Sequence, residues 1–109
     1  MSEDQEKRAR EMAQELRSLR VEDILVNTLV AVSSIGYQRL GATPDTLEDR
    51  DLDQVRLAID TMQSLTAVLE TFVPDELLKD FTAAVASLQL AYVQAAAEDQ
   101  ASEPAPDQP

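Results

Sequence analysis

The segment 23–40, DILVNTLVAVSSIGYQRL, constrains the fold more than any other part of the chain. Its apolar residues recur with helical spacing and cover almost the whole circumference of a helix: Ile24, Leu25, Val26, Leu29, Val30, Ala31, Val32, Ile35, Tyr37 and Leu40. The many β-branched residues would also suit a buried strand, but strands rarely exceed ~10 residues. Acidic residues at its start favour a helix N-terminus, and Arg39 followed by Gly41 favours a C-terminus. We predict a helix at about 22–40 that neighbouring protein surrounds, because it is hydrophobic on nearly every side.

Length and composition favour one type of fold and exclude several types of reactive site. The 109 residues correspond to one domain, and the scarcity of glycine, with two in the chain, favours an all-α fold. The chain has no Cys and no His, so it lacks disulfides, thiol nucleophiles, imidazole acid–base groups and the common zinc ligands. The clean apolar part of 22–40 covers about 14 residues, fewer than the ~20 that cross a bilayer. Because residues 1–20 also lack the apolar core of a signal peptide, we expect a cytoplasmic protein without a membrane partner.

Charge is distributed unevenly along the chain. Residues 1–20 hold five acids and five bases, whereas residues 21–109 hold 16 acids and four bases and carry the whole net charge of −12. An acidic surface of this kind repels phosphate backbones, so nucleic acid is not an expected partner.

The N-terminal segment 1–20 is predicted to form a separate charged helix at about 3–19. Acid-then-base pairs four residues apart support it, and its narrow apolar stripe consists of Ala9, Met12, Leu16 and Leu19. Neither Gly nor Pro separates it from the next helix. We place a break near 18–21, and a single continuous helix is the alternative.

Two further helices follow the loop 41–50. A third helix at about 51–72, capped by Asp49 or Asp51, has an apolar stripe consisting of Leu52, Val55, Ile59, Met62, Leu65, Leu69 and Phe72. Leu57 and Val68 lie off this stripe, on a second and weaker apolar strip. A proline corner precedes the fourth helix, at about 74–97, whose heptad-like seam consists of Leu78, Phe81, Val85, Leu88, Tyr92 and Ala95.

The chain is therefore predicted to divide into three parts. A charged helix occupies residues 1–20, and a domain of three core helices occupies residues 21–97. The acidic, Pro-rich residues 98–109 lack apolar anchors and are predicted to be disordered.

The strongest candidate for metal chemistry is the run Asp49, Asp51 and Asp53, because a calcium loop places alternating carboxylates around one ion. However, Gln54 occupies the position where the tight turn of such a loop requires Gly, and Asp60 replaces the bidentate Glu. An acidic cap on a helix N-terminus explains the run better. We predict no catalytic residue, no cofactor and no metal site.

Three polar residues of segment 22–40, Asn27, Ser33 and Ser34, are predicted to be buried. Buried polar groups need hydrogen-bond partners. We expect these three to bond to their own helix backbone or to fix the register of helix pairing.

The arrangement resembles a bacterial family known as domain of unknown function 1844. The resemblance is carried by LVNTLVAVSSIGYQRLG (25–41), DLDQVRLAIDTMQSLTAVLE (51–70) and LQLAYVQA (88–95), and it covers residues 21–96. It implies a small cytosolic helical protein, and it assigns no activity and no functional residue.

The leading hypothesis for function is a non-catalytic helical module that self-associates as a dimer or binds a protein partner. Its predicted interface consists of Val26, Val30, Tyr37, Leu78, Phe81, Val85, Leu88 and Tyr92. One alternative is a carboxylate-based divalent-metal protein or enzyme that uses Asp49, Asp51 and Asp53. Another is an acidic chaperone or adaptor for a basic client protein.

Overall fold

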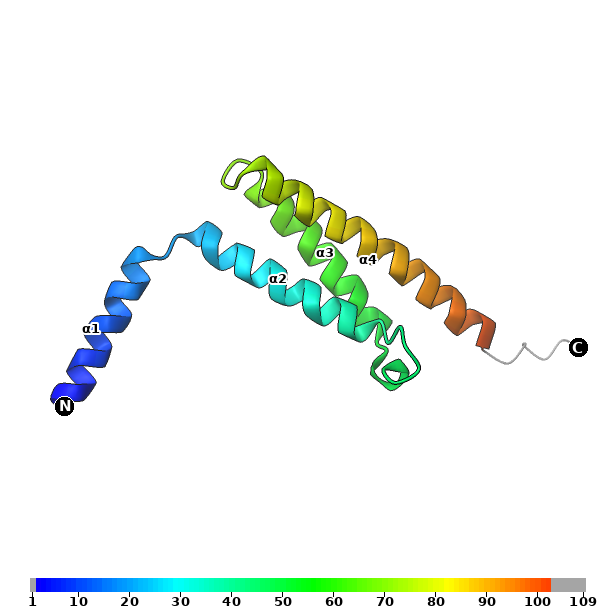
Figure 1. Cartoon of the computed structure of the whole chain (residues 1–109), viewed down its shortest axis with the longest axis horizontal. Helices are drawn as coiled ribbons and strands as arrows, with labels where there is room; N and C mark the ends of the chain where they lie inside the picture. The colour runs from blue at the N-terminus through cyan, green and yellow to red at the C-terminus, as the bar shows by residue number, and fades with distance from the viewer. Residues whose placement is uncertain (1, 103–109) are drawn as a thin grey trace, which may run out of the picture.

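The structure is a computed structural model that describes residues 2–102, and it is built from α-helices. The elements are α1 (Glu3–Ser18), α2 (Val21–Arg39), the short 3₁₀-helix η1 (Leu47–Asp49), α3 (Leu52–Leu69) and α4 (Asp75–Ser102), as Figure 1 shows. No strand occurs among residues 2–102. The predicted all-α fold, with three core helices preceded by a charged helix, is confirmed.

Helix α1 stands apart from the other helices. It projects from the start of α2 (Figure 1), and none of its residues is buried. Leu19 and Arg20 separate the two helices with extended backbone, at ψ values of 135° and 151°. Two interactions hold the first turn of α2. The Arg20 backbone amide donates to the Asp23 carboxylate over 3.4 Å, and the Arg20 side chain forms an ion pair with Glu22. The predicted break between the two helices is confirmed, and one continuous helix is wrong.

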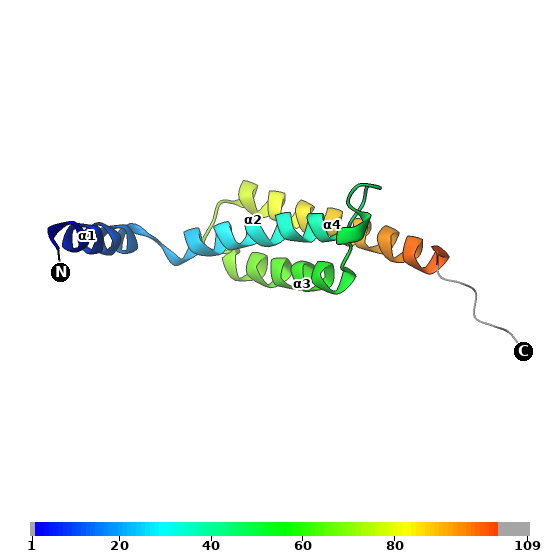
Figure 2. The same cartoon turned by 90° about the horizontal axis from the view of Figure 1, so that it is seen from below.

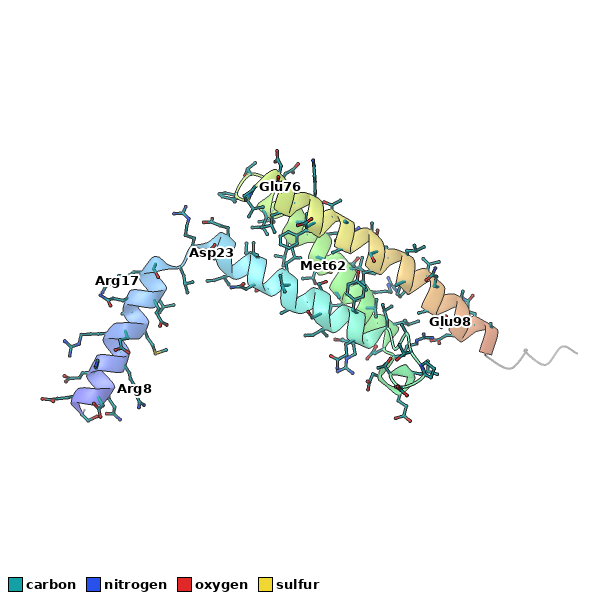
Figure 3. All side chains as sticks on the ribbon, in the orientation of Figure 1. Arg8, Arg17, Asp23, Met62, Glu76 and Glu98 are labelled. Atoms are coloured by element: carbon teal, nitrogen blue, oxygen red, sulfur yellow. The ribbon has the colours of Figure 1, made fainter. Side chains whose placement is uncertain are left out.

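Helices α2, α3 and α4 form the packed part of the molecule. Each is antiparallel to the next, and α3 packs along both of the others, whereas α2 and α4 touch over a shorter stretch (Figures 1 and 2). The most deeply buried side chains come from all three helices and are Leu29, Val55, Met62, Leu69 and Leu88. Met62 lies in the middle of the bundle (Figure 3).

Gly36 lets α2 approach both of its neighbours at one point. A Cβ atom at this position would lie 2.9 Å from Ala58 Cβ and 2.9 Å from Leu88 Cδ2, which is closer than carbon atoms pack. The absence of a side chain therefore sets the spacing of the three helices here.

The loop after α2 is held by Gly41 and Arg50. Gly41 adopts a φ of +56°, the left-handed conformation that ends many helices, and a Cβ atom there would lie 2.7 Å from the Thr46 carbonyl oxygen. Arg50 Nε donates to the Leu40 carbonyl over 2.7 Å, and Arg50 Nη2 to the Gly41 carbonyl over 3.3 Å. Arg50 thus satisfies carbonyl groups that the end of α2 leaves free.

Arg50 also ties this loop to the C-terminal part of α4. Its Nη1 donates to the Ala95 carbonyl over 3.3 Å and to Asp99 over 2.7 Å, and its Nη2 donates to Glu98 over 3.0 Å. The hydrogen bond with Asp99, followed by that with Glu98, raises the pKa of Arg50 above its ordinary value. A raised arginine pKa keeps the guanidinium charged as far as strongly alkaline pH.

Two predicted boundaries are corrected. The third helix ends at Leu69 instead of residue 72, and α4 continues to Ser102 instead of ending at 97. Residues 98–102, predicted to belong to a disordered tail, are therefore helical. The alanine-rich sequence preceding Glu98 favours helix, and the contacts of Arg50 with Glu98 and Asp99 hold this part of α4. The rest of the predicted tail, 103–109, lies outside the described residues.

Segment 22–40 is not enclosed on all sides within one chain, which leaves the predicted interface residues Val30 and Tyr37 uncovered, whereas the predicted burial of its polar residues is corrected. Only Leu29 and Gly36 of α2 are buried, together with Leu40 just after it. Asn27 and Ser34 are exposed and Ser33 is half-buried, and no polar side chain is buried among the described residues. The reason is that α3 and α4 cover one side of α2, while α1 covers none of it.

Candidate protein-interaction surface

An uncovered apolar strip runs along α2 on the side next to α3. Val21, Ile24, Ala31 and Ile35 lie on it together with Thr28, and steps of three and four residues place all five on one side of the helix. Val21 is 70% exposed, and Ile24 and Ile35 are each 49% exposed. The Thr28 hydroxyl donates to the Ile24 carbonyl over 2.8 Å, so the polar group within the strip already has a partner in its own helix.

A matching strip runs along α3. Leu57, Thr61, Ser64 and Val68 follow each other at steps of four, three and four residues, and Phe72 extends the strip just beyond the helix. The large side chains Leu57, Val68 and Phe72 are all more than half exposed. Leu57 and Val68 belong to the second, weaker strip that the sequence places beside the main stripe of this helix. Phe72, predicted on the main stripe, is exposed instead, because α3 ends at Leu69.

The two strips meet along the α2–α3 pair. At one end Val21 and Leu25 line a cleft with Val68 and Phe72, and at the other end Gly36 lies against Ala58. Because the helices are antiparallel, the strips run side by side between these points. We call this surface the α2–α3 face and define it by Val21, Ile24, Ile35, Leu57, Val68 and Phe72.

The α2–α3 face differs in charge from the rest of the molecule. The positions of its two strips carry Val, Ile, Thr, Ala, Leu and Ser and include no charged residue, although the chain has a net charge of −12. Continuous apolar surface that is exposed and rimmed by polar residues is typical of protein-interaction sites.

A third uncovered stripe lies on α1. Met12 is 65% exposed and Leu16 66%, and Leu19 just after the helix is also exposed. These residues form the narrow stripe that the sequence predicts, and no other helix lies over it.

Much of the predicted interface lies inside the chain's own core, which is a correction. Phe81, Val85 and Leu88 are buried, and Leu78 and Tyr92 are half-buried against the same core. The seam of α4 faces α3 and α2 of the same chain, so these five side chains are not free to bind a partner. Helical spacing identifies residues that share a side of a helix but does not identify the neighbour on that side.

The other three predicted interface residues lie on the side of α2 next to α4. Val30 and Tyr37 are exposed, and Val26 is half-buried against the core. The Tyr37 hydroxyl is 3.5 Å from the Ala84 carbonyl of α4, a distance at the limit for a hydrogen bond. These residues form a smaller apolar strip, separate from the α2–α3 face.

The three carboxylates weighed as candidate metal ligands are not brought together. Asp49 ends η1, Asp51 caps α3 by accepting a hydrogen bond from the Gln54 amide over 3.2 Å, and Asp53 is exposed. Arg50 turns back from this run toward α4. Among residues 2–102, no three acidic side chains lie close enough together to hold a metal ion.

Two further observations concern membrane-spanning helices and similarity to known proteins. Within the part of the chain that the structure describes, no helix has the length and apolarity needed to cross a membrane. Comparisons with protein-family models, with curated proteins and with solved structures give no match. The resemblance of residues 21–96 to domain of unknown function 1844 therefore stays a prediction.

Proposed function

We propose that this chain is a non-catalytic protein-interaction module that self-associates, with a second copy covering the α2–α3 face. The observation that carries the proposal is the size of this face, on which six large apolar side chains are each about half exposed or more. Covering half of such a side chain contributes roughly 1 kcal/mol. A symmetric pair covers two equivalent faces, which gives a total comparable with the cost of association.

Charge supports a second copy as the occupant. Two chains that each carry a net charge of −12 repel each other over most of their surfaces. The α2–α3 face has no charged residue on its strips, and Glu22, which lines the cleft at one end, is paired with Arg20. A basic client protein, the occupant expected for an acidic adaptor, would instead prefer the acidic surface outside this face.

The proposal also covers the absence of catalysis and the location of the protein. A non-enzymatic role is supported by the lack of His and Cys and by the exposed carboxylates of the run 49–53. Arg50, which belongs to this run, bonds to Ala95 and Asp99 of α4 instead. The proposed cytoplasmic location rests on the amino-acid sequence alone.

Light scattering of the full chain with two matched variants tests the proposal. Leu57 and Leu90 are 58% and 61% exposed, but Leu57 lies on the α2–α3 face and Leu90 on α4. We expect the wild type and Leu90→Glu to have twice the 12.0 kDa mass of one chain, and Leu57→Glu to approach the mass of one chain. Circular dichroism should show a folded helical bundle in all three proteins, because neither leucine is buried. A wild-type protein that stays monomeric, or equal dissociation of the two variants, would contradict the proposal.

A further inference from the structure

We propose that the second copy reaches the α2–α3 face with its helix α1, so that two chains exchange their N-terminal helices. This inference rests on the proposed function, because it names the part of the second copy that covers the face. It starts from two uncovered apolar surfaces in one chain, the α1 stripe of Met12, Leu16 and Leu19 and the α2–α3 face.

Helix α1 is well formed although none of its residues is buried. Ser2 and Gln5 cap its N-terminus reciprocally. The backbone amide of Gln5 donates to the Ser2 hydroxyl over 3.2 Å, and the backbone amide of Ser2 donates to the side-chain carbonyl of Gln5 over 3.3 Å. Short isolated helices are marginal in water, and most of their stability in proteins comes from packing of the apolar side. A capped helix with an uncovered apolar stripe is therefore suited to dock on another surface.

The junction between α1 and α2 directs α1 away from its own bundle. Leu19 and Arg20 are extended, and the bonds of Arg20 to Glu22 and Asp23 belong to the start of α2. As a result α1 extends outward from the start of α2, with Arg8 far from the three packed helices (Figure 3). An element held out on a short junction is the arrangement from which identical chains exchange segments.

Helix α1 as a whole is long enough for the α2–α3 face, although its apolar stripe from Met12 to Leu19 covers only about 10 Å of that length. The 16 residues of α1 span about 24 Å at 1.5 Å per residue. On the same measure, the strip from Val21 to Ile35 spans about 21 Å. One α1 can therefore lie along the α2–α3 face from end to end.

The charges of the two surfaces are complementary. Residues 1–20 have five acids and five bases, whereas residues 21–109 have an excess of 12 acids. Helix α1 itself has five acids and four bases, so it is close to neutral and is the part of a second copy that the acidic body repels least. Arg8 lies four residues before Met12 in the same helix, so this base flanks the stripe. Asp53 and Asp60 occupy corresponding flanking positions beside Leu57.

A pair of full-length variants separates this inference from the proposed function. Leu16→Glu places a negative charge on the α1 stripe, and Gln14→Glu places the same charge on the opposite side of α1. We expect Gln14→Glu to associate like the wild type and Leu16→Glu to associate at least about tenfold more weakly. If Leu16→Glu associates as well as Gln14→Glu while Leu57→Glu dissociates, the face is covered by a part of the second copy other than α1. The exchange is then wrong and the proposed function stands. A wild type without any dimer overturns both.

Cysteine cross-linking identifies which chain supplies the helix. The native chain has no Cys, so each single variant carries one thiol. Mixing Leu16→Cys with Val68→Cys or Leu57→Cys, followed by mild oxidation, should give disulfide-linked pairs between unlike variants. Mixing Leu16→Cys with the control Leu90→Cys should give few.

The same chemistry tests whether α1 folds back on its own body. A chain that carries both Leu16→Cys and Val68→Cys should form disulfides between two chains. A disulfide within one chain, formed at an undiminished rate on dilution, would show that α1 covers its own face and would overturn the exchange. Equal cross-linking to Val68→Cys, Leu57→Cys and Leu90→Cys would overturn it as well.

Discussion

Helices α1 and α4 carry similar apolar stripes, but the two stripes have opposite environments. In α4, Phe81 and Leu88 are 7% and 0% exposed, whereas Met12 and Leu16 of α1 are 65% and 66% exposed. The residue spacing is the same in both helices. The difference lies in the connections, because the corner before α4 turns it back against α3, and the extended residues before α2 direct α1 outward. A stripe therefore predicts a buried surface only where the chain supplies a neighbour.

The largest expected effect is on the buried stripe. Replacing Leu88 with Ala should lower the free energy of unfolding by about 3–4 kcal/mol, because it leaves a cavity at a fully buried site. Urea denaturation followed by circular dichroism measures the change. A loss below about 1 kcal/mol would mean that the α4 stripe is not packed as the structure describes.

The next largest effect concerns Arg50, whose side chain bonds the C-terminal part of α4 to the loop after α2. We expect Arg50→Met to lower the free energy of unfolding by about 2–3 kcal/mol, since it leaves the carbonyls of Leu40, Gly41 and Ala95 without this donor. The matched comparison is the double variant Glu98→Gln and Asp99→Asn. It should cost less than about 1 kcal/mol, because both carboxylates are exposed to solvent. Equal losses would indicate that the ion pairs, and not the carbonyl contacts, hold the loop.

A smaller effect is expected where α2 meets both of its neighbours. Gly36→Ala should destabilise the bundle by about 1–2 kcal/mol, because the new Cβ atom meets Ala58 and Leu88 at 2.9 Å. The higher helix propensity of Ala offsets about 1 kcal/mol of the steric cost. An increase in the melting temperature would show that α2 packs less closely than described.

The smallest effect on one chain is expected in α1. Leu16→Ala should change the free energy of unfolding by less than about 0.5 kcal/mol at concentrations where the chains are separate, because Leu16 is 66% exposed. Hydrogen exchange should show weaker protection of α1 than of α3 under these conditions. Protection of α1 should rise with protein concentration if a second copy covers it. Strong protection of α1 in separate chains would mean that α1 packs on its own body.

The amino-acid sequence predicts the helices better than it predicts their surroundings. Helical spacing, the junction at 18–21 and the cap Asp51 can each be recognised from neighbouring residues, and the structure agrees with all three. The end of α4 could not be placed in this way, because Arg50 holds it through contacts with Glu98 and Asp99 far along the chain.

The candidate surface was only partly predictable for a related reason. The strip of Leu57 and Val68 is recognisable in the sequence, but its exposure is seen only once the three helices are packed. The seam of Phe81, Val85 and Leu88 is the opposite case, an apolar strip that is buried. Local spacing identifies the seam, but only the packing of the three helices shows that it lies against α3 and α2.

The most direct test of self-association through the α2–α3 face is the mass of the full chain in solution as a function of concentration. We predict a reversible change from 12.0 kDa to twice that mass in the wild type and in Leu90→Glu, and its loss in Leu57→Glu. A wild-type mass of 12.0 kDa at every concentration would contradict self-association. A dimer that tolerates Leu57→Glu as well as Leu90→Glu would contradict the assignment of the α2–α3 face.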